Sequence, residues 1–421
     1  MPQPRRRLRI LILTHHYPPE IGAPQTRLSE TAAFLRSHGH DVRVLAAFPS
    51  YPTGQIPPAY RGRALCSEAI YGIPIYRTWT YARPGASALG RLLNQLSFTL
   101  SAPLALPWVG NRDVILVESP PLFLGATGLL LGRLLGAPTI LHVSDLWPAV
   151  AIQLGALRHR AAVGAATAFE RAVYRLSRGL VVVTEAWVAE LVGRGVPAHK
   201  IRLVTNGVDT DLLDPRVAVG ERQAVRAGLG LGDEIVVVCL GTVSQVYDYA
   251  AILHAAHRLR HRSDIRFLIV GDGSGKPAVE RLVDQLALAN VRLLPAQPHE
   301  RVPNLLAAAD ISAVALQPIP FTRGQLPVRV LEAMAMALPV ILAGSGEAQR
   351  LVAGVGAGTA VGSKDVEGLA QAIERLAADP QTRRQMGARG RRAVESRFSR
   401  ATVAGRIERA LYAAVRPMPG D

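Results

Sequence analysis

The sequence has few of the residues that build disulfide, zinc or nucleic-acid sites. Its 421 residues include only two cysteines, Cys66 and Cys239, which stand far apart and outside any CxxC pattern. Such a pair cannot form a disulfide framework, and a structural zinc site needs more ligands close by. Aromatic residues make up 5% and the arginines are dispersed, whereas nucleic-acid modules cluster basic and aromatic side chains. We expect a protein of a reducing compartment that binds no nucleic acid.

Long apolar runs are also missing. The most apolar stretch, residues 122–135, is interrupted by three glycines and one arginine, and it falls short of the roughly 20 apolar residues that a spanning helix needs. The first apolar run, residues 8–13, is too short for the core of a signal peptide. We expect a cytoplasmic protein, with peripheral association at the inner membrane face as a further option.

One segment bears on that option. Residues 89–108 place Leu92, Leu93, Leu96 and Leu100 on one side of a helix. Such a stripe most often packs against the protein's own core, and we favour this interpretation. The alternative is a helix that lies on an anionic lipid surface.

Negative charge and lysine are both scarce. The chain has 48 Lys and Arg against 32 Asp and Glu, for a net charge of +16, and only three of the basic residues are lysines. A chain this basic favours anionic partners, such as phosphorylated substrates or an anionic membrane face. The arginine bias also fits the base composition of a genome, which we consider its stronger explanation.

The sequence alternates short apolar runs with amphipathic helices. Several runs are unbroken, such as IVVVCLG at 235–241, which is typical of strands covered on both faces of a parallel sheet. Repeated strand–helix–strand units predict an α/β fold with Rossmann-like domains. The predicted strands are 8–13, 42–47, 114–117, 139–143, 180–183, 201–204, 235–240, 267–270, 291–294, 311–316, 340–342 and 358–361, and two of the predicted helices are 29–37 and 278–288.

A break in this alternation predicts the domain boundary. Residues 207–232 are charged and Gly-rich and have no clear strand period, which indicates a linker together with a short helix. We expect an N-terminal domain at 1–206, a C-terminal domain at 233–395 and a final helix at 396–421.

Two motifs of the N-terminal half follow strands, at the edge where open parallel sheets bind ligands. In HHYPPEIGAP at 15–24, Gly22 and Ala23 allow a ligand to approach the backbone, although an ordinary proline-rich loop fits as well. In HVSDLWP at 142–148, Asp145 either caps the next helix or orients a substrate hydroxyl.

Two glycine turns lie between a strand and a helix in the C-terminal half. They are GTVSQ at 241–245 and GDGSGK at 271–276. Neither has the spacing of a P-loop, so each is a tight turn or a contact for a phosphate group.

The segment FTRGQLPVRVLEAMAMALPVI at 321–341 is the most informative motif. It leads through Pro327 into a helix, and the backbone amides of 324–328 would face an anion. Arg329 and Glu332 are three residues apart and share one side of the helix. A carboxylate there suits a ribose diol and an arginine suits a diphosphate, while an ion pair between the two is the alternative.

Groups for metal or covalent chemistry are not evident. No DxD pair lies outside the linker, and no nucleophile elbow is present. We expect a site without metal or cofactor, in which fixed positive dipoles stabilise a departing phosphate.

From Leu8 to about Val415 the chain resembles the family-4 glycosyltransferases of the GT-B fold. The motifs that carry this resemblance are YPPEIGAPQTRLSE, FPSYPTG, SPPLFLGATG, SDLWP, TNGVDTDLL, GDGSGK, PHERVPNLLAAADI and LPVRVLEAMAMALPVI. SPPLFLG and the loop with Phe321, Arg323 and Gly324 are most similar to the fucosamine-transferase-like branch of surface-polysaccharide assembly.

The resemblance implies two Rossmann-like domains facing across a cleft, with the final helix crossing back to the N-terminal domain. It also implies transfer of a sugar, with retained configuration and without metal, from a nucleotide diphosphate, usually UDP, to a saccharide. We expect this acceptor on a lipid diphosphate at an anionic membrane surface. The N-terminal domain is expected to bind the acceptor and the C-terminal domain the donor.

The sequence departs from the family pattern at three places. Gly324 stands where the family has the first acid of its Glu-x7-Glu motif, so sugar contacts must come from backbone amides around Gly324 and Gln325. Ser144 with Asp145 replaces a His-Asp pair, and Thr242 and Tyr247 replace the usual Arg and Lys. Arg329, Lys276 and helix amides are the expected substitutes at the diphosphate.

The complete set of predicted site residues is as follows. Donor binding is assigned to Gly22, Ala23, Gly241, Thr242, Gly271, Gly273, Lys276, Pro298, Val302, Leu326, Arg329 and Glu332, acceptor binding to Tyr17, Glu20, Tyr51 and Ser144, and the catalytic positions to Asp145, Gly324 and Gln325. Two alternatives stay open, namely a nucleotide-sugar epimerase of the same fold and a non-catalytic, membrane-associated assembly subunit.

Overall fold

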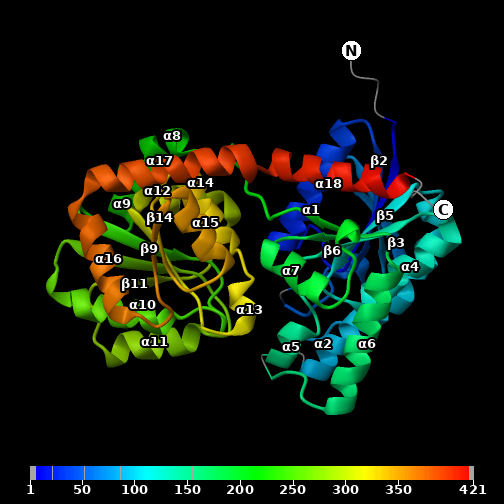
Figure 1. Ribbon diagram of the computed structural model, residues 1–421, viewed down its shortest axis with the longest axis horizontal. Coiled ribbons are helices and arrows are strands. Elements are labelled where there is room, and N and C mark those ends of the chain that lie inside the picture. The colour runs from blue at the N-terminus through cyan, green and yellow to red at the C-terminus, as the bar shows by residue number, and fades with distance from the viewer. Residues whose placement is uncertain (1–5, 21, 52, 86, 154, 417–421) are drawn as a thin grey trace. The chain divides into compact units, whose positions relative to one another are not determined.

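The structure is a computed structural model that describes residues 6–416 except positions 21, 52, 86 and 154 (Figure 1). The chain divides into two compact units. The first contains Met1–Thr205 together with Val403–Asp421, and the second contains Asn206–Thr402. Of the predicted final helix, residues 417–421 lie outside the described part of the chain.

The first unit is built on an eight-stranded sheet with the order β3-β4-β2-β1-β5-β6-β7-β8. Strands β3 and β4 pair antiparallel and all other neighbours are parallel. The strands are β1 (Arg9–Thr14), β2 (Asp41–Ala47), β3 (Leu65–Ile70), β4 (Ile73–Thr78), β5 (Val114–Ser119), β6 (Thr139–Val143), β7 (Gly179–Val182) and β8 (Ile201–Leu203). The helices are α1 (Ala23–Ser37), η1 (Pro58–Tyr60), α2 (Ala88–Ser101), η2 (Ala102–Ala105), α3 (Leu106–Val109), α4 (Phe123–Leu135), α5 (Ala149–Gln153), α6 (Arg160–Leu176), α7 (Glu185–Gly193), η3 (Ala198–Lys200) and α18 (Arg400–Val415).

The second unit is built on a parallel six-stranded sheet with the order β11-β10-β9-β12-β13-β14. Buried clusters lie on both faces of this sheet, as expected for a doubly wound domain. The strands are β9 (Ile235–Leu240), β10 (Ile265–Val270), β11 (Val291–Leu294), β12 (Ile311–Ala315), β13 (Val340–Ala343) and β14 (Gly358–Val361). The helices are α8 (Pro215–Ala218), η4 (Val219–Glu221), α9 (Arg222–Gly228), α10 (Tyr249–Arg258), η5 (Leu259–His261), α11 (Lys276–Gln285), η6 (His299–Arg301), α12 (Val302–Ala308), α13 (Pro320–Arg323), α14 (Val328–Ala335), α15 (Glu347–Val355), α16 (Val366–Ala378) and α17 (Pro380–Arg397).

The prediction of two Rossmann-like sheets is confirmed, and all twelve predicted strands are present with ends shifted by at most two residues. The hairpin β3–β4 was not predicted. It forms an edge of its sheet, β3 is nowhere fully buried, and β4 contains Pro74. The buried guanidinium of Arg77 also interrupts the apolar pattern of β4, because it pairs with Glu68 on β3.

Residues 207–232, predicted as a linker with a short helix, are assigned to the second unit, and the short helix α9 lies within them. Val208 forms a β-bridge with Ser399. The side chain of Arg226 is buried and donates from Nε to the carbonyl of Gly232 (2.8 Å) and from Nη1 to the carbonyl of Ala308 (2.8 Å). These contacts of an arginine with carbonyl groups give no periodic signal in the sequence.

Helix α18 completes the core of the first unit. It begins at Arg400 rather than at 396, since α17 continues to Arg397. Beyond Thr402 the helix packs Ile407 and Leu411 into the buried cluster that contains Leu8 and Ile10 of the first strand region. The predicted return of the final helix to the N-terminal part of the chain therefore holds for the described residues.

Our favoured interpretation of the leucine stripe at 89–108 is wrong. In α2 the side chains of Leu92, Leu93 and Leu100 are exposed rather than packed on the core. Among the described residues no helix combines the length and the apolarity that crossing a membrane requires.

Candidate functional site

The glycine turns of the second unit lie at the carboxyl ends of β9 and β10. Gly241 has a φ of +118°, and Gly271, at +155°, packs directly against it. A Cβ atom on Gly271 would lie 2.0 Å from the carbonyl oxygen of Gly241, which no side chain tolerates. Both positions need glycine so that the two turns can meet at one sheet edge, where backbone groups are open to a ligand.

Arg329 brings a fixed positive charge to this edge. It lies in the first turn of α14, where it donates from Nη2 to the carbonyl of Thr242 (2.9 Å) and from Nη1 to the hydroxyl of Tyr249 (3.1 Å). Its guanidinium stacks on the ring of Tyr247 at 3.7 Å from the centroid. The same guanidinium lies where a Cβ of Gly241 would be, at 2.7 Å. The charge is therefore held in one orientation by three neighbours.

Glu332 lies one turn further along α14 and is half-buried. Burial raises the pKa of its carboxyl group, and the charges of Arg329 and Arg400 oppose this shift only in part. Within the described part of the chain this carboxylate has no hydrogen bond or ion pair, not even with Arg329. The alternative of an ion pair within the helix is not observed. A desolvated carboxylate without a donor is suited to receive one from a ligand.

The loop before α14 differs from the prediction. The N–H groups of Gly324 and Gln325 donate to the carbonyls of Phe321 (3.1 Å) and Thr322 (3.2 Å), because residues 320–323 form the helical turn α13. These two amides are thus not available for the sugar as predicted. Instead, Oε1 of Gln325 is buried without a hydrogen-bond partner in the described structure.

Further predicted donor residues are placed as follows. Val302 and Leu326 belong to the buried core of the second unit, so their side chains support the site through packing. Lys276 opens α11 and pairs with Asp272 (2.5 Å), so its charge is already balanced. Pro298 precedes η6, after the end of β11. Position 273 must be glycine, because a Cβ atom there would lie 2.2 Å from the carbonyl oxygen of Val243.

In the first unit, two predicted acceptor residues prove to be structural. Tyr17 is buried in the core of this unit. The carboxylate of Glu20 is also buried and accepts from the backbone N–H groups of Ser50 (2.7 Å) and Tyr51 (2.8 Å), while His16 Nδ1 lies 2.9 Å from its other oxygen. Glu20 thus joins the loops after β1 and β2.

Tyr51 and the start of α1 are the other predicted positions of this unit. Tyr51 is exposed and its ring meets that of His16 edge-to-face, with 5.6 Å between centroids. Gly22 and Ala23 begin α1, with the carbonyl of Gly22 accepting from Thr26. Tyr51 and the start of α1 thus remain candidates for ligand contact at this edge of the sheet.

A buried charge cluster lies at the carboxyl ends of β5 and β6. Glu118 pairs with Arg27 of α1 and accepts from the hydroxyl of Ser144 (2.7 Å). His142 Nδ1 lies 3.1 Å from its other oxygen. Despite burial, the charge of Arg27 and these hydrogen bonds hold the pKa of Glu118 at about 2, so this carboxyl group is ionised.

Asp145 lies beside this cluster, and its pKa is shifted upward rather than downward. Burial and the negative charge of Glu118 raise its pKa to about 7, against the opposing effect of Arg27. Two carboxylates with pKa values pushed this far apart are a common feature of sites that hold or move protons. The expected role of Asp145, orienting a hydroxyl, is compatible with this environment, and Ser144 is within the same hydrogen-bond network.

Arg27, Glu118 and His142 were not among the predicted site residues. Glu118 could have been found, because it follows the unbroken apolar residues 114–117 and stands at a strand end as Asp145 does. Arg27 had no such signal, since its partner lies 91 residues away in the chain.

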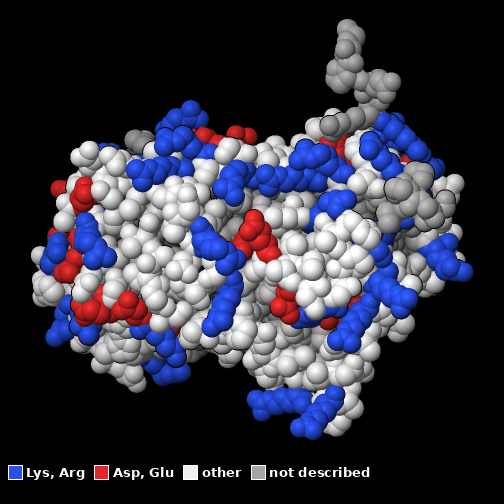
Figure 2. All heavy atoms as spheres, viewed as in Figure 1, with Lys and Arg blue, Asp and Glu red and all other residues white. Residues whose placement is uncertain are grey.

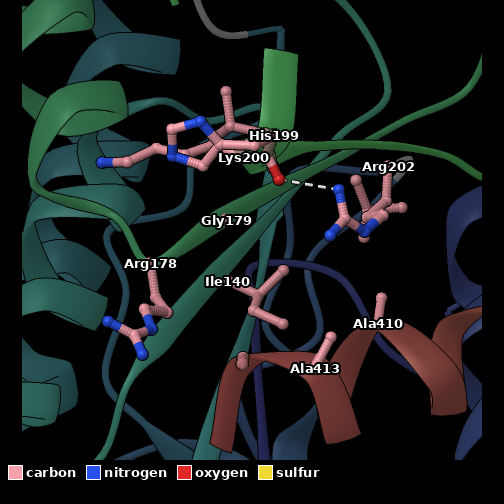
Figure 3. A pocket seen from close by; sticks show the side chains of 11 residues that line it. Ile140, Arg178, Gly179, His199, Lys200, Arg202, Ala410 and Ala413 are labelled. Atoms are coloured by element: carbon pink, nitrogen blue, oxygen red, sulfur yellow. Dashed lines mark hydrogen bonds between the residues drawn. The ribbon is translucent and has the colours of Figure 1, made fainter. Parts of the chain in front are cut away.

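One cavity of the first unit lies at the amino ends of its strands, opposite to the carboxyl ends where the predicted site residues lie (Figure 3). It is lined by Gly179 at the start of β7, by the basic side chains of Lys200 and Arg202, and by Ala410 and Ala413 of α18. None of the predicted site residues lines it. Across the described residues, no three His, Cys, Asp or Glu side chains gather in a metal-binding group; metal independence stays a prediction.

Two family models match the chain. Residues 22–207 match the glycosyl transferase 4-like domain, and residues 221–393 match the glycosyl transferases of group 1. The second match includes the glycine turns, Arg329 and Glu332, and the first includes the cluster around Glu118.

Known proteins resemble the chain over much of its length. It is 29% identical over 314 residues to the protein named colanic acid biosynthesis glycosyl transferase WcaI of Escherichia coli (strain K12), a match of 73% of this chain and 76% of WcaI. It is 32% identical over 203 residues to the GDP-mannose-dependent alpha-(1-6)-phosphatidylinositol monomannoside mannosyltransferase of Mycolicibacterium smegmatis, covering 46% of this chain and 52% of that protein.

The fold matches solved structures of the GT-B type. The crystal structure of HepE from Anabaena in complex with UDP and glucose has a TM-score of 0.71 and 19% identity, covering 97% of this chain and 100% of HepE. At this identity the likeness concerns the fold, and the expected two-domain α/β architecture is confirmed.

Proposed function

This chain belongs to the group 1 glycosyltransferases, and we propose that it transfers a sugar from a uridine diphosphate donor to a saccharide acceptor in surface-polysaccharide synthesis. One observation carries the proposal. Helix α14 presents both the fixed guanidinium of Arg329 and the unpartnered carboxylate of Glu332 beside two glycine turns. A nucleoside diphosphate offers the complementary groups, since its phosphates accept hydrogen bonds and its ribose hydroxyls donate them.

In this proposal Glu332 accepts hydrogen bonds from the ribose diol and Arg329 lies along the diphosphate. In the first turn of α14 the N–H of Val330 donates to the carbonyl of Pro327 (3.0 Å). The N–H groups of Val328 and Arg329 precede the first acceptor within the helix, and they add positive dipoles on the side of the leaving group. Negative charge develops on the diphosphate as the bond between the anomeric carbon and oxygen breaks. Fixed donors stabilise that charge without needing to reorganise, so no metal is needed.

The acceptor is expected on the first unit, near Asp145 and Ser144. A pKa of about 7 leaves Asp145 able to accept a hydrogen bond from an attacking hydroxyl at neutral pH. We propose that the leaving phosphate takes the hydroxyl proton from the same face, which retains the anomeric configuration. The buried pair of Glu118 and Arg27 serves to hold this end of the site in place.

The finer assignments rest on the sequence motifs. We propose that the chain belongs to the fucosamine-transferase-like branch, on the basis of SPPLFLG and the loop with Phe321, Arg323 and Gly324. WcaI is named for the synthesis of a surface polysaccharide. We propose a lipid-linked saccharide as acceptor and action at the cytoplasmic face of the membrane. UDP is the proposed donor nucleotide, although the mycobacterial relative is named for GDP-mannose.

Binding of nucleotides tests this function directly. We expect UDP and one or more UDP-sugars to bind in the presence of a chelator, and to raise the melting temperature more than GDP-sugars do. The variant Arg329→Lys loses the planar stack on Tyr247 and the second hydrogen bond, which should weaken UDP binding about tenfold. The matched control is Arg281→Lys on α11, where the arginine is exposed.

The outcomes separate the alternatives. Release of UDP that depends on an added saccharide supports a transferase, and interconversion of the sugar without an acceptor supports an epimerase. A protein that binds none of the nucleotides or nucleotide sugars refutes the proposal and favours a non-catalytic subunit.

A further inference from the structure

Helix α2 turns its apolar side away from the core of the first unit. Leu89 is 64% exposed and Leu100 is 78% exposed, and the side chains of Leu92 and Leu93 are exposed as well. The spacings of three, four and seven residues place these leucines on one side of the helix, together with half-buried Leu96. An ordinary surface helix has the reverse orientation.

Hydrogen bonds on the other side hold α2 in this orientation. Asn94 donates from Nδ2 to the carbonyl of Tyr81 (2.6 Å), and its Oδ1 lies 2.8 Å from Nε2 of His15. The hydroxyl of Ser97 accepts from the N–H of Tyr81 (2.8 Å), and that of Ser101 donates to the carbonyl of Trp79 (2.5 Å). Rotating the helix to bury its leucines would leave these polar groups without partners, which is costly in a buried position.

The exposed apolar surface continues beyond α2. In η2 and α3, Leu104 and Trp108 are also exposed by half or more. Helix α4 packs beside α2, with Thr127 donating to the carbonyl of Thr99, and exposed Leu130 and Leu134 lie three and seven residues after Thr127 on that side of α4. A contiguous apolar surface of this kind on a globular protein marks an interaction site.

The charged side chains carried by the elements of this surface are of one sign. Residues 71–112 contain no Asp or Glu, whereas Arg83 and Arg91 are exposed there. Helix α4 carries one charged side chain, Arg133, which is exposed too. Figure 2 shows basic and no acidic residues at the lower end of the first unit in this view, where Figure 1 places α2, α5 and α6. Such a rim is complementary to anionic lipid headgroups, and it disfavours pairing with the same surface of a second copy.

We propose that this surface, formed by α2, η2, α3 and the adjoining side of α4, docks on an anionic lipid bilayer. The leucines and Trp108 enter the boundary between headgroups and acyl chains while the arginines meet the headgroups. The proposal deepens the proposed function, on which its purpose rests. Because Asn94 of α2 bonds to His15 at the end of β1, docking holds the ligand-binding edge of the first unit at the membrane, where a lipid-linked acceptor lies.

Co-sedimentation with vesicles tests the docking. We expect the full chain to bind vesicles of equal parts phosphatidylcholine and phosphatidylglycerol, and to bind phosphatidylcholine alone at least on the order of tenfold more weakly. The double variant Leu93→Glu and Leu100→Glu should lose the binding to anionic vesicles by on the order of tenfold or more. Leu176→Glu, at the end of α6, is the matched control because it changes an equally exposed leucine elsewhere on this unit.

Each further outcome decides between docking and its alternatives. An unchanged melting temperature and UDP affinity in the double variant show that the fold is intact. Wild-type protein that ignores anionic vesicles, or a double variant that binds them as the wild type does, overturns the proposal. A wild-type dimer that the double variant splits shows instead an interface between copies. Vesicle binding that persists in a chain unable to bind nucleotides refutes the proposed function but leaves the docking standing.

Discussion

Replacing Glu332 by glutamine should raise the stability of the free protein and weaken its binding of UDP. Burial raises the pKa of this carboxyl group, with only partial relief from Arg329 and Arg400. A carboxyl group whose pKa is higher in the folded than in the unfolded state costs stability as the pH rises through these values, and the full cost remains at neutral pH. Glutamine carries no charge, so Glu332→Gln should melt at a higher temperature at neutral pH.

The effect on the nucleotide has the opposite sign. A hydrogen bond to a charged group contributes about 1.5–3 kcal/mol, which corresponds to about 10- to 150-fold in affinity for UDP. In the wild type the affinity should also fall as acid protonates Glu332, a dependence that the variant lacks. Isothermal titration with UDP and thermal melting measure both quantities, and Glu280→Gln on the exposed side of α11 is the control. A variant that loses stability, or that binds UDP as the wild type does, refutes the assignment of Glu332 to the ribose.

Two predictions concern the charge cluster of the first unit. The rate of sugar transfer should rise as the pH passes through about 7, where Asp145 ionises, and Asp145→Asn should remove this rise in a pH profile of kcat/KM; an unchanged profile contradicts a role for this carboxylate. Glu118→Gln removes the buried negative charge that Arg27 faces and should lower the free energy of unfolding, measured in urea, by about 3–5 kcal/mol. Because the pKa of Glu118 is lowered to about 2, this contribution should be present above the usual range of a glutamate and be lost as the pH falls toward 2, and a variant as stable as the wild type at neutral pH would contradict it.

The sheets could be predicted from the sequence because their strands are unbroken apolar runs such as β9, which need no knowledge of distant residues. The hairpin β3–β4 could not, since its buried polar member, Arg77, is tolerated only through Glu68 and two carbonyl groups. The orientation of α2 could not be predicted either, because it also depends on polar contacts with residues outside the element. Its leucines follow an ordinary amphipathic pattern, and the partners that reverse it are Tyr81 and His15, outside the helix.

In the candidate site, too, local features could be predicted and contacts between distant residues could not. Glycine turns and the spacing of Arg329 and Glu332 are local features, so they could be found in the sequence. The roles of Tyr17 and Glu20 depend on burial and on contacts with Ser50 and Tyr51, which local patterns do not reveal.

The contribution of α18 to the first core has a consequence for biosynthesis. Val403, Ile407 and Leu411 pack with Leu8 and Ile10, and Glu408 accepts hydrogen bonds from His38 and His40. A domain usually folds as a unit soon after it leaves the ribosome. Here the first unit must wait for nearly the whole chain to be translated before its hydrophobic interior can close. Until then the nascent sheet lacks the cover of α18, so a premature stop codon before residue 403 removes part of the first core as well as the end of the second unit.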